Sequence, residues 1–244
     1  MHSNRTAERE CKKKRLEYKI FKNNMTINQS KGNMYGFVTH TWNPIKGRCS
    51  HDCKYCYMKV FPQGELRFDE KELQTDLGRN NFIFVGSSCD MWVNEVTDSL
   101  IKMIINHCKK YLENTYLFQS KNPMRFVKLR DELISLNCIL GTTMETNRQE
   151  ILNKISNAPL INERSDAMTI KGFRKMITIE PIIDFDVMPF VSEIERTNPE
   201  FVNIGADSKN HNLIEPSPFK IQNLIKELEK FTKVILKDNL NRLK

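Results

Sequence analysis

Strand-like and helix-like stretches alternate along most of this chain of 244 residues, and this alternation restricts its fold more than any other feature. Short runs rich in apolar, β-branched and aromatic residues predict seven strands. These runs are Tyr35–Trp42, Phe82–Gly86, Thr115–Gln119, Cys138–Thr143, Met176–Glu180, Phe201–Gly205 and Val234–Leu236. Helical patterns lie at 69–77, 96–112, 123–135, 147–156, 187–196 and 217–231. Repeated strand–helix units of this kind build a parallel sheet covered by helices.

The number of these units narrows the architecture further. Six or seven units are too few for a closed barrel of eight parallel strands. We therefore expect an α/β fold with a partial, open parallel barrel of the (βα)6 type over residues 34–244. The segment 157–174 is irregular and mixed in charge, and we expect it to be a loop near the barrel mouth. In parallel barrels the functional side chains follow the carboxyl ends of the strands.

The first 33 residues differ from the rest of the chain in charge. They carry nine Lys and Arg residues against three acidic residues, whereas the other residues carry 29 against 27. Residues 1–33 are therefore predicted to form a basic N-terminal extension, with an amphipathic helix over 7–22 and a loop over 23–33. The nearly neutral body argues against a broad phosphate-binding face, while contact between the basic extension and nucleic acid stays open.

Cysteine usage and hydropathy indicate the compartment. No apolar run approaches the roughly 20 residues that cross a bilayer, and the first residues lack the apolar segment of a secretory signal. The seven Cys residues are an odd number, which fits poorly with a disulfide framework. We expect a cytoplasmic protein with free thiols and no membrane partner.

Three of the thiols are closely spaced after the first predicted strand. Cys49, Cys53 and Cys56 form a CxxxCxxC pattern. Three thiolates can hold three irons of a [4Fe–4S] cluster and leave the fourth iron open, whereas most electron-carrier clusters use four Cys ligands. A structural zinc site is the alternative, because His51 inside the loop, or His40 before it, could supply a fourth ligand. In that case the chain would be a non-enzymatic zinc-binding module.

The CxxxCxxC spacing, with Tyr55 just before the last cysteine, resembles the cluster loop of the radical S-adenosylmethionine (SAM) superfamily. The resemblance implies a partial barrel, a [4Fe–4S] cluster on Cys49, Cys53 and Cys56, and SAM bound to the open iron. Reduction would then release a 5′-deoxyadenosyl radical. It also implies that Tyr55 lies beside the SAM adenine and that an electron donor such as flavodoxin or ferredoxin is a partner.

Two further strand ends resemble the SAM-binding segments of this superfamily. A small-residue turn follows the second strand, and polar residues follow the fourth. The resemblance implies that Asp90 meets the methionine amino group, and that Glu145 or its neighbours bind the ribose hydroxyls or the carboxylate. The alternative is that both groups cap the helices that follow. The expected SAM-binding residues are Tyr55, Ser87, Ser88, Asp90, Thr143, Glu145 and Asn147.

Glu180, Asp207 and Lys237 follow the last three predicted strands and form the expected substrate-binding set. A carboxylate at a barrel mouth is costly unless it is paired or functional. A carboxylate can also accept two parallel N–H bonds, as a guanine-like edge would offer them. The alternative is a structural ion pair, for example between Glu180 and Lys237.

The Thr-Trp-Asn-Pro approach to the cluster loop and the Ile-Glu-Pro strand end resemble a compact, phage-associated radical SAM subfamily. Among compact enzymes the nearest resemblance is to queuine lyases, which implies a small substrate, queuine, split at a C–N bond to free 7-aminomethyl-7-deazaguanine. The sequence therefore predicts a radical SAM carbon–nitrogen lyase. The alternative within the superfamily is a lyase or repair enzyme that acts on nucleic acid.

Overall fold

A computed structural model describes residues 26–30 and 35–244, so the expected helix over 7–22 lies outside the described residues. One sheet of eight strands organises the fold, in the order β1-β2-β5-β6-β7-β8-β9-β10. The strands are β1 (Asn28–Gln29), β2 (His40–Trp42), β5 (Phe82–Val85), β6 (Thr115–Gln119), β7 (Cys138–Thr143), β8 (Arg174–Ile179), β9 (Phe201–Ile204) and β10 (Lys233–Leu236). All neighbours from β2 to β10 pair in parallel, and β1 adds an antiparallel edge. This confirms the expected open, mostly parallel sheet.

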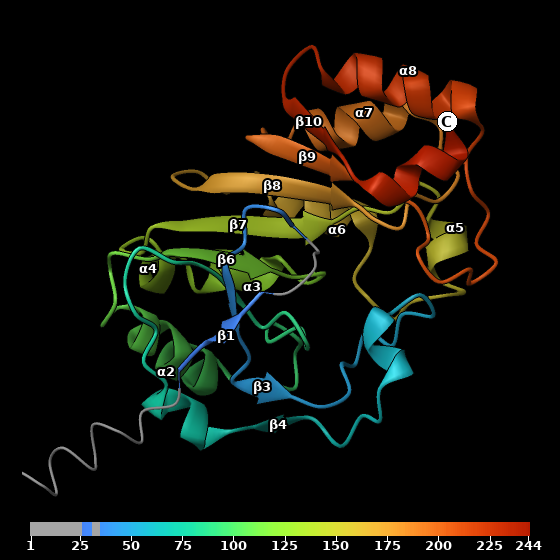
Figure 1. Cartoon of the computed structure of the whole chain (residues 1–244). Coiled ribbons are helices and arrows are strands. Elements are labelled where there is room, and N and C mark those ends of the chain that lie inside the picture. The colour runs from blue at the N-terminus through green and yellow to red at the C-terminus, as the bar shows by residue number, and fades with distance from the viewer. Residues whose placement is uncertain (1–25, 31–34) are drawn as a thin grey trace, which may run out of the picture.

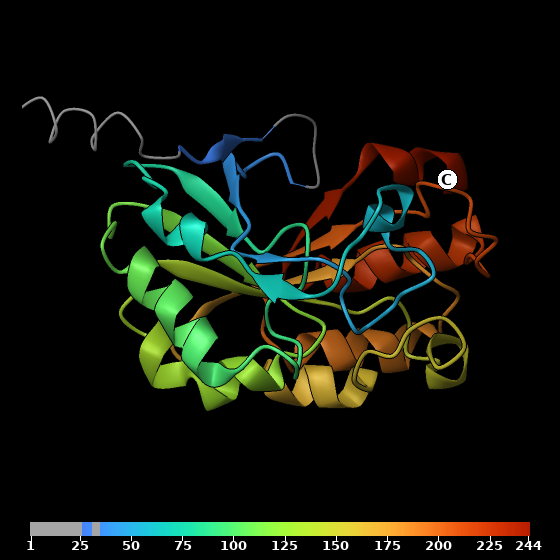
Figure 2. The same ribbon diagram turned by 90° about the horizontal axis from the view of Figure 1, so that it is seen from below.

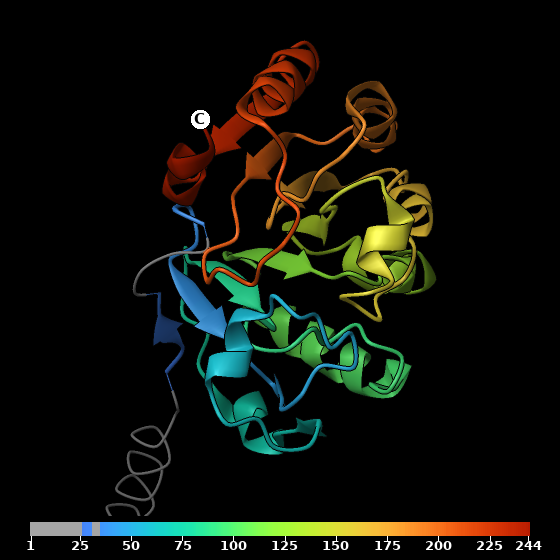
Figure 3. The same ribbon diagram turned by 90° about the vertical axis from the view of Figure 1, so that its right-hand side faces the viewer.

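The helices lie outside the curved sheet, which forms an open arc when it is viewed along the strands (Figure 3). They are α2 (Asp98–Cys108), α3 (Met124–Lys128), α4 (Arg130–Leu133), α5 (Gln149–Leu152), α6 (Ile161–Ala167), α7 (Val187–Glu195) and α8 (Pro218–Leu228). Three 3-10 helices join them: η1 (Tyr57–Val60), η2 (Glu70–Gln74) and η3 (Asp238–Leu243). A small hairpin of β3 (Ile45–Lys46) and β4 (Arg67–Phe68) flanks the sheet (Figure 1). None of these helices is long and apolar enough to span a membrane.

The structure corrects several boundaries. Segment 157–174, expected to be a loop, contains helix α6, and the expected loop 23–33 contains strand β1. Helix α6 escapes a simple apolar pattern because Arg164 and Ser165 lie on its buried face beside Ile161. The helix expected over 123–135 is divided at Leu129, which has φ −108° and ψ 24°. The first strand covers only the last three residues of its expected range.

Alternating residues of the strands build two apolar layers, one on each face of the sheet. The larger layer is made of side chains from the sheet and from the helices, and Figure 2 shows these helices along one face of the sheet. The smaller layer lies inside the arc. Its strand residues come from five neighbouring strands: Phe84, Leu117, Ile139, Met176 and Phe201. This apolar floor closes the inside of the arc below the strand ends.

Polar side chains form the next level above that floor. Thr143 and Thr178 lie side by side in the register of β7 and β8. The hydroxyl of Tyr35 lies 2.8 Å from Gln119 Oε1 and 2.7 Å from Thr178 Oγ1. The inside of the arc therefore changes from apolar to polar toward the carboxyl ends of the strands.

Candidate active site

A cavity of about 610 Å³ opens at the carboxyl ends of the parallel strands, between the polar level of the sheet and the loop that carries the three thiols. The structure brings eleven of the thirteen expected site residues to its wall. These are Cys49, Cys53, Tyr55, Cys56, Ser87, Ser88, Asp90, Thr143, Glu180, Asp207 and Lys237. Glu145 and Asn147 are not among the residues that line it.

Backbone contacts hold the thiol loop in place. Gly47 has a φ of +103°, and a Cβ there would lie 2.0 Å from the carbonyl oxygen of Glu65, so the turn into the loop requires glycine. The amide of Lys54 donates to the carbonyl of Ile155 at 2.8 Å, and the amide of Asn157 donates to the carbonyl of His51 at 2.7 Å. The segment before α6 therefore supports the loop from outside.

The three thiols fit the donor set of an iron–sulfur cluster. Cys53 is buried beside the hydroxyl of Ser156, at 3.1 Å. A hydrogen bond with Cys89, together with burial, raises the pKa of Cys49, and burial raises the pKa of Cys56. In the described part of the chain, no three His, Cys, Asp or Glu side chains converge to hold a single metal ion. A [4Fe–4S] cluster binds its thiolates through separate irons, so three thiols spread around one cavity suit it.

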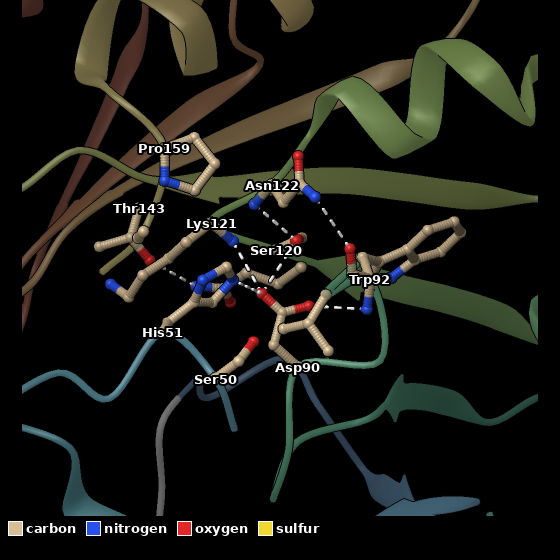
Figure 4. A network of polar contacts seen from close by, with 12 residues as sticks. Ser50, His51, Asp90, Trp92, Ser120, Lys121, Asn122, Thr143 and Pro159 are labelled. Atoms are coloured by element: carbon tan, nitrogen blue, oxygen red, sulfur yellow. Dashed lines mark hydrogen bonds and ion pairs between the residues drawn. The ribbon is translucent and has the colours of Figure 1, made fainter. Parts of the chain in front are cut away.

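His51 is held by a buried carboxylate (Figure 4). Asp90 Oδ2 accepts hydrogen bonds from His51 Nε2 at 3.0 Å, from the Ser120 hydroxyl at 2.9 Å and from the Lys121 amide at 2.9 Å. Asp90 Oδ1 accepts from the Trp92 amide at 2.9 Å. Although burial alone would raise it, the pKa of Asp90 is lowered, with the His51 hydrogen bond as the largest favourable cause.

Asp90 Oδ2 thus accepts three of these four bonds and Oδ1 accepts one. Asp90 therefore joins the thiol loop to the segments that follow β5 and β6. The arrangement favours a positioning role for Asp90. It also occupies His51 Nε2, one of the two ring nitrogens that could bind a zinc ion.

The serine turn after β5 is shaped by Asn43, which the sequence reading did not single out. Asn43 Oδ1 accepts from the Ser88 amide at 2.9 Å and from the Ser87 hydroxyl at 3.1 Å. Gly86 has a φ of +79° at the start of the turn. The Tyr57 hydroxyl donates to the carbonyl of Ser87 from the other side of the cavity. The turn is thus fixed from two segments and presents both serines to the cavity.

Glu145 lies behind the cavity wall rather than on it. Its side chain is fully buried, and it accepts hydrogen bonds from Arg164 Nη1 at 2.9 Å, Lys121 Nζ at 2.5 Å and the Tyr55 hydroxyl. Burial would raise the pKa of Glu145, but the charges of Lys121 and Arg164 outweigh it and lower the pKa well below its usual value. Glu145 therefore positions two residues that do line the cavity, Tyr55 and Lys121.

Lys121 and Arg164 are functional candidates that the sequence reading missed. Lys121 Nζ lies 5.1 Å from the ring centroid of Tyr55, close enough for a cation–π contact. Lys121 stands directly after the third predicted strand, so its position was a usable signal. Arg164 stands on α6, in the segment expected to be a loop. Asn147, in contrast, exchanges hydrogen bonds with the backbone of Asp186 away from the cavity.

The expected substrate residues gather at the opposite end of the cavity. Lys237 Nζ donates to Glu180 Oε2 at 2.6 Å, and Asn239 Nδ2 donates to Oε1 at 3.1 Å. Lys237 Nζ also lies 5.0 Å from the ring centroid of Tyr35. Gly205 lies against the carboxylate, where a Cβ would lie 2.7 Å from Glu180 Oε1. Glu180 is thus both paired and presented to the cavity.

Comparisons with known proteins bear on the fold. No protein-family model matches the chain, and no curated protein matches it. Solved structures of spore photoproduct lyase are similar to it in fold. The lyase complexed with dinucleoside spore photoproduct has a TM-score of 0.63 at 11% identity, over 88% of this chain and 79% of that chain.

Two mutants of the same lyase match over comparable lengths. One with dinucleoside spore photoproduct has a TM-score of 0.64 at 10% identity, over 87% of this chain and 80% of that chain. One with bound AdoMet and dinucleoside spore photoproduct has a TM-score of 0.55 at 12% identity, over 85% of this chain and 66% of that chain. The chain therefore shares the fold of spore photoproduct lyase, a radical SAM enzyme.

Proposed function

We propose that this protein is a radical SAM enzyme whose cluster is held by Cys49, Cys53 and Cys56. One observation carries the proposal: the three thiols of a CxxxCxxC loop line the same cavity as the polar strand ends of a radical SAM-type fold. Bound and reduced there, the cluster would supply the electron that cleaves SAM. The adenosyl radical released from SAM would then abstract hydrogen from the substrate. Flavodoxin or ferredoxin remains the expected electron donor.

The wall near the thiols suits the polar parts of SAM. The Tyr55 ring offers a flat apolar surface for the adenine. Ser87, Ser88 and Thr143 offer hydroxyl groups, and Lys121 offers a cation for the carboxylate. Lys121 replaces Glu145 and Asn147 in the proposed set because it lies on the wall and they do not. The geometry of Asp90 and Glu145 holds these groups in place before SAM binds.

The substrate end favours a small molecule. A cavity of about 610 Å³ lies in the range of small-molecule sites. Glu180, fixed by Lys237 and Asn239, presents a carboxylate that can accept N–H groups from the edge of a 7-deazaguanine. We infer that the reaction is the cleavage of a C–N bond in queuine, which frees 7-aminomethyl-7-deazaguanine.

Anaerobic reconstitution tests the proposal. The protein should bind iron and sulfide, and with SAM and a reductant it should form 5′-deoxyadenosine. Formation should rise with queuine and be accompanied by the aminomethyl base. The triple replacement of Cys49, Cys53 and Cys56 by Ala should abolish both products. A colourless protein that holds one zinc and no sulfide would instead support the zinc-binding module.

A second candidate is a radical SAM lyase that acts on nucleic acid. It is favoured by the fold shared with spore photoproduct lyase, whose structures hold a dinucleoside photoproduct. Residues 1–33, with their excess of Lys and Arg, would bind phosphates. DNA or RNA binding that weakens steeply with salt, and that is lost on removal of residues 1–33, would favour this candidate. Binding that is absent at low salt would exclude it.

A further inference from the structure

The carboxylate of Asp207 is turned toward its own loop, where it holds a histidine. Asp207 Oδ1 accepts a hydrogen bond from His211 Nδ1 at 2.6 Å and one from the Lys209 amide at 3.2 Å. Asp207 Oδ2 accepts from the His211 amide at 2.5 Å. Only 4% of the Asp207 side chain is exposed, against 22% for His211, and both residues line the cavity. His211 is therefore better placed than Asp207 to meet a substrate.

This geometry determines the protonation pattern of the ring. Burial alone would raise the pKa of Asp207, but the hydrogen bonds from His211 lower it, so the carboxylate is ionised and can only accept. His211 Nδ1 must then carry the shared proton. In neutral His211 the lone pair is on Nε2, for which no hydrogen-bond partner exists within residues 26–30 and 35–244. The ring is thus held with one basic nitrogen available to a ligand.

Two charged groups near this pair are themselves paired, whereas Lys209, which also lines the cavity, is exposed. Arg242 donates to the carbonyl of Asp207 at 2.9 Å and forms an ion pair with Glu215. Elsewhere on the cavity wall Lys237 is paired with Glu180 at 2.6 Å. Asp207 is therefore the carboxylate that is left to stabilise a positive charge on His211.

We propose that His211 is a catalytic proton-transfer residue and that Asp207 positions it. The inference deepens the proposed function and rests on it. The substrate class is an amine that carries a hydroxyl group on the carbon adjacent to the nitrogen-bearing carbon. His211 Nε2 accepts the hydroxyl proton and returns it to the departing nitrogen.

The atoms and electrons of this step balance. Hydrogen abstraction leaves an unpaired electron on the hydroxyl-bearing carbon. His211 Nε2 takes the hydroxyl proton, while the O–H electron pair stays on the oxygen. The C–O bond becomes C=O as the neighbouring C–N bond breaks, and the unpaired electron moves to the carbon that held the nitrogen. The nitrogen leaves with the C–N electron pair and takes the proton from Nε2, which restores neutral imidazole.

The first test separates hydrogen abstraction from bond cleavage. The reconstituted full chain is given queuine that carries deuterium on its hydroxyl-bearing carbons. In His211→Gln, release of the aminomethyl base should fall by about 100- to 10,000-fold, the usual range for a lost acid–base group. Transfer of deuterium into 5′-deoxyadenosine should persist. Added imidazole should partly restore cleavage in His211→Ala, which a merely structural role would not allow.

A loop variant supplies the matched control. Asn210, next to His211, is exposed and has a φ of +53°, which glycine adopts freely. Asn210→Gly should therefore cleave queuine at the wild-type rate. If His211→Gln also cleaves at that rate, the role of His211 is overturned while the proposed function stands. If the wild-type protein forms neither 5′-deoxyadenosine nor the aminomethyl base, the proposed function fails and this inference fails with it.

The second test needs no turnover. Nitrogen NMR of the full chain, labelled at histidine, should show neutral His211 with its proton on Nδ1. In Asp207→Asn this preference should be lost and cleavage should fall, although His211 itself is unchanged. A proton on Nε2 in the wild-type protein would overturn the assignment.

Discussion

His51 Nε2 lies 3.0 Å from Asp90 Oδ2, so a carboxylate at the end of β5 holds the segment between Cys49 and Cys53. The other oxygen of Asp90 accepts the Trp92 amide, which ties the same carboxylate to its own loop. Because the histidine and the carboxylate are both almost fully enclosed, their contact is protected from solvent. The position of the thiol loop therefore depends on a residue that contributes no ligand.

Asp90→Asn should weaken both the fold and the cluster site. An amide nitrogen in place of Asp90 Oδ2 would turn its own N–H groups toward the donors of His51, Ser120 and Lys121, which would then lose their acceptor. Hydrogen bonds to charged groups are worth about 1.5–3 kcal/mol each, so we expect the free energy of unfolding to fall by about 2–4 kcal/mol. Iron and sulfide retained after reconstitution should fall as well. Denaturant unfolding and metal analysis measure the two effects.

The control for this change is Asp131→Asn, because 96% of the Asp131 side chain is exposed. It should alter the free energy of unfolding by less than about 0.5 kcal/mol, as surface changes usually do. An Asp90→Asn protein that kept the wild-type stability and iron content would show that the thiol loop holds its position without this contact.

Glu145→Gln should be strongly destabilising, with a dependence on pH. Breaking a buried ion pair typically costs about 3–5 kcal/mol, and the Glu145–Arg164 pair is fully buried. The lowered pKa of Glu145 means that its stabilising effect is complete above the usual carboxyl value of about 4.3 and is lost as the pH falls toward the folded-state value. The stability gap between wild type and variant should therefore be largest at neutral pH and should narrow under acid.

Denaturant unfolding over a series of pH values measures this gap. Glu200→Gln is the control, because Glu200 pairs with Arg174 at the surface, where an ion pair contributes about 1 kcal/mol or less. A gap that stayed constant from neutral to acidic pH would mean that Glu145 is not ionised in the folded protein.

The fold was largely readable from the sequence because strand signals are local. An apolar run with β-branched residues, such as Cys138–Thr143, is typical of a buried strand in a parallel sheet. This signal can be read from the run alone, without knowing which strands lie beside it. Helix α6 was missed because the charge of Arg164 looks like a surface feature in the sequence. Its partner, Glu145, lies 19 residues earlier on another element. Only the folded chain shows that the charge is buried and neutralised.

The site residues also fall into two groups, those that a local sequence pattern indicates and those that only the folded chain reveals. The three cysteines are proposed as ligands from their local spacing, which the sequence shows directly. Whether a carboxylate at a strand end faces the cavity depends on its neighbours in space. Asp90, Glu145 and Asp207 all follow predicted strands, yet the carboxylate of each accepts hydrogen bonds from other groups of the chain. His211, which Asp207 holds, carries no signal of its own in the sequence.

Single replacements of the thiols should separate ligands from neighbours. Cys49→Ala, Cys53→Ala and Cys56→Ala should each lose most of the bound iron, since each thiolate would hold a different iron of the proposed cluster. Cys89→Ala should keep it, although Cys89 contributes to the raised pKa of Cys49. Iron and sulfide per folded chain, with the visible absorption of the cluster, provide the measurement.

Cys108→Ala is the matched control for these variants, because Cys108 is buried on α2 within the larger apolar layer, which is made of side chains from the sheet and the helices. It should lower stability through lost packing but leave the iron content unchanged. Loss of iron in Cys89→Ala as complete as in Cys53→Ala would make Cys89 a fourth ligand, and the cluster would then have no open iron for SAM.

Gly205→Ala should disturb the substrate end without touching the thiols. The new Cβ would lie 2.7 Å from Glu180 Oε1 and 2.8 Å from Cδ, while Lys237 and Asn239 hold the carboxylate in place. Glu180 must then move, and overpacking of this kind costs about 1–3 kcal/mol of stability. A shift near 1 Å can lower turnover about 100-fold. Steady-state kinetics with queuine should show the loss, while the iron content stays at the wild-type value.

Two further variants make this prediction specific. Gly64→Ala adds the same methyl group where its nearest neighbour would be the Arg67 side chain at 3.4 Å, an ordinary contact, so it should have little effect. In a double-mutant cycle, Gly205→Ala should cost almost nothing when Glu180→Ala has already removed the atoms it would meet, because the two changes share one contact. If the two costs simply add, the methyl group acts on stability by another route and Glu180 is not held against Gly205. If they do not add, the methyl group acts on stability through its contact with Glu180, and the carboxylate is held against Gly205.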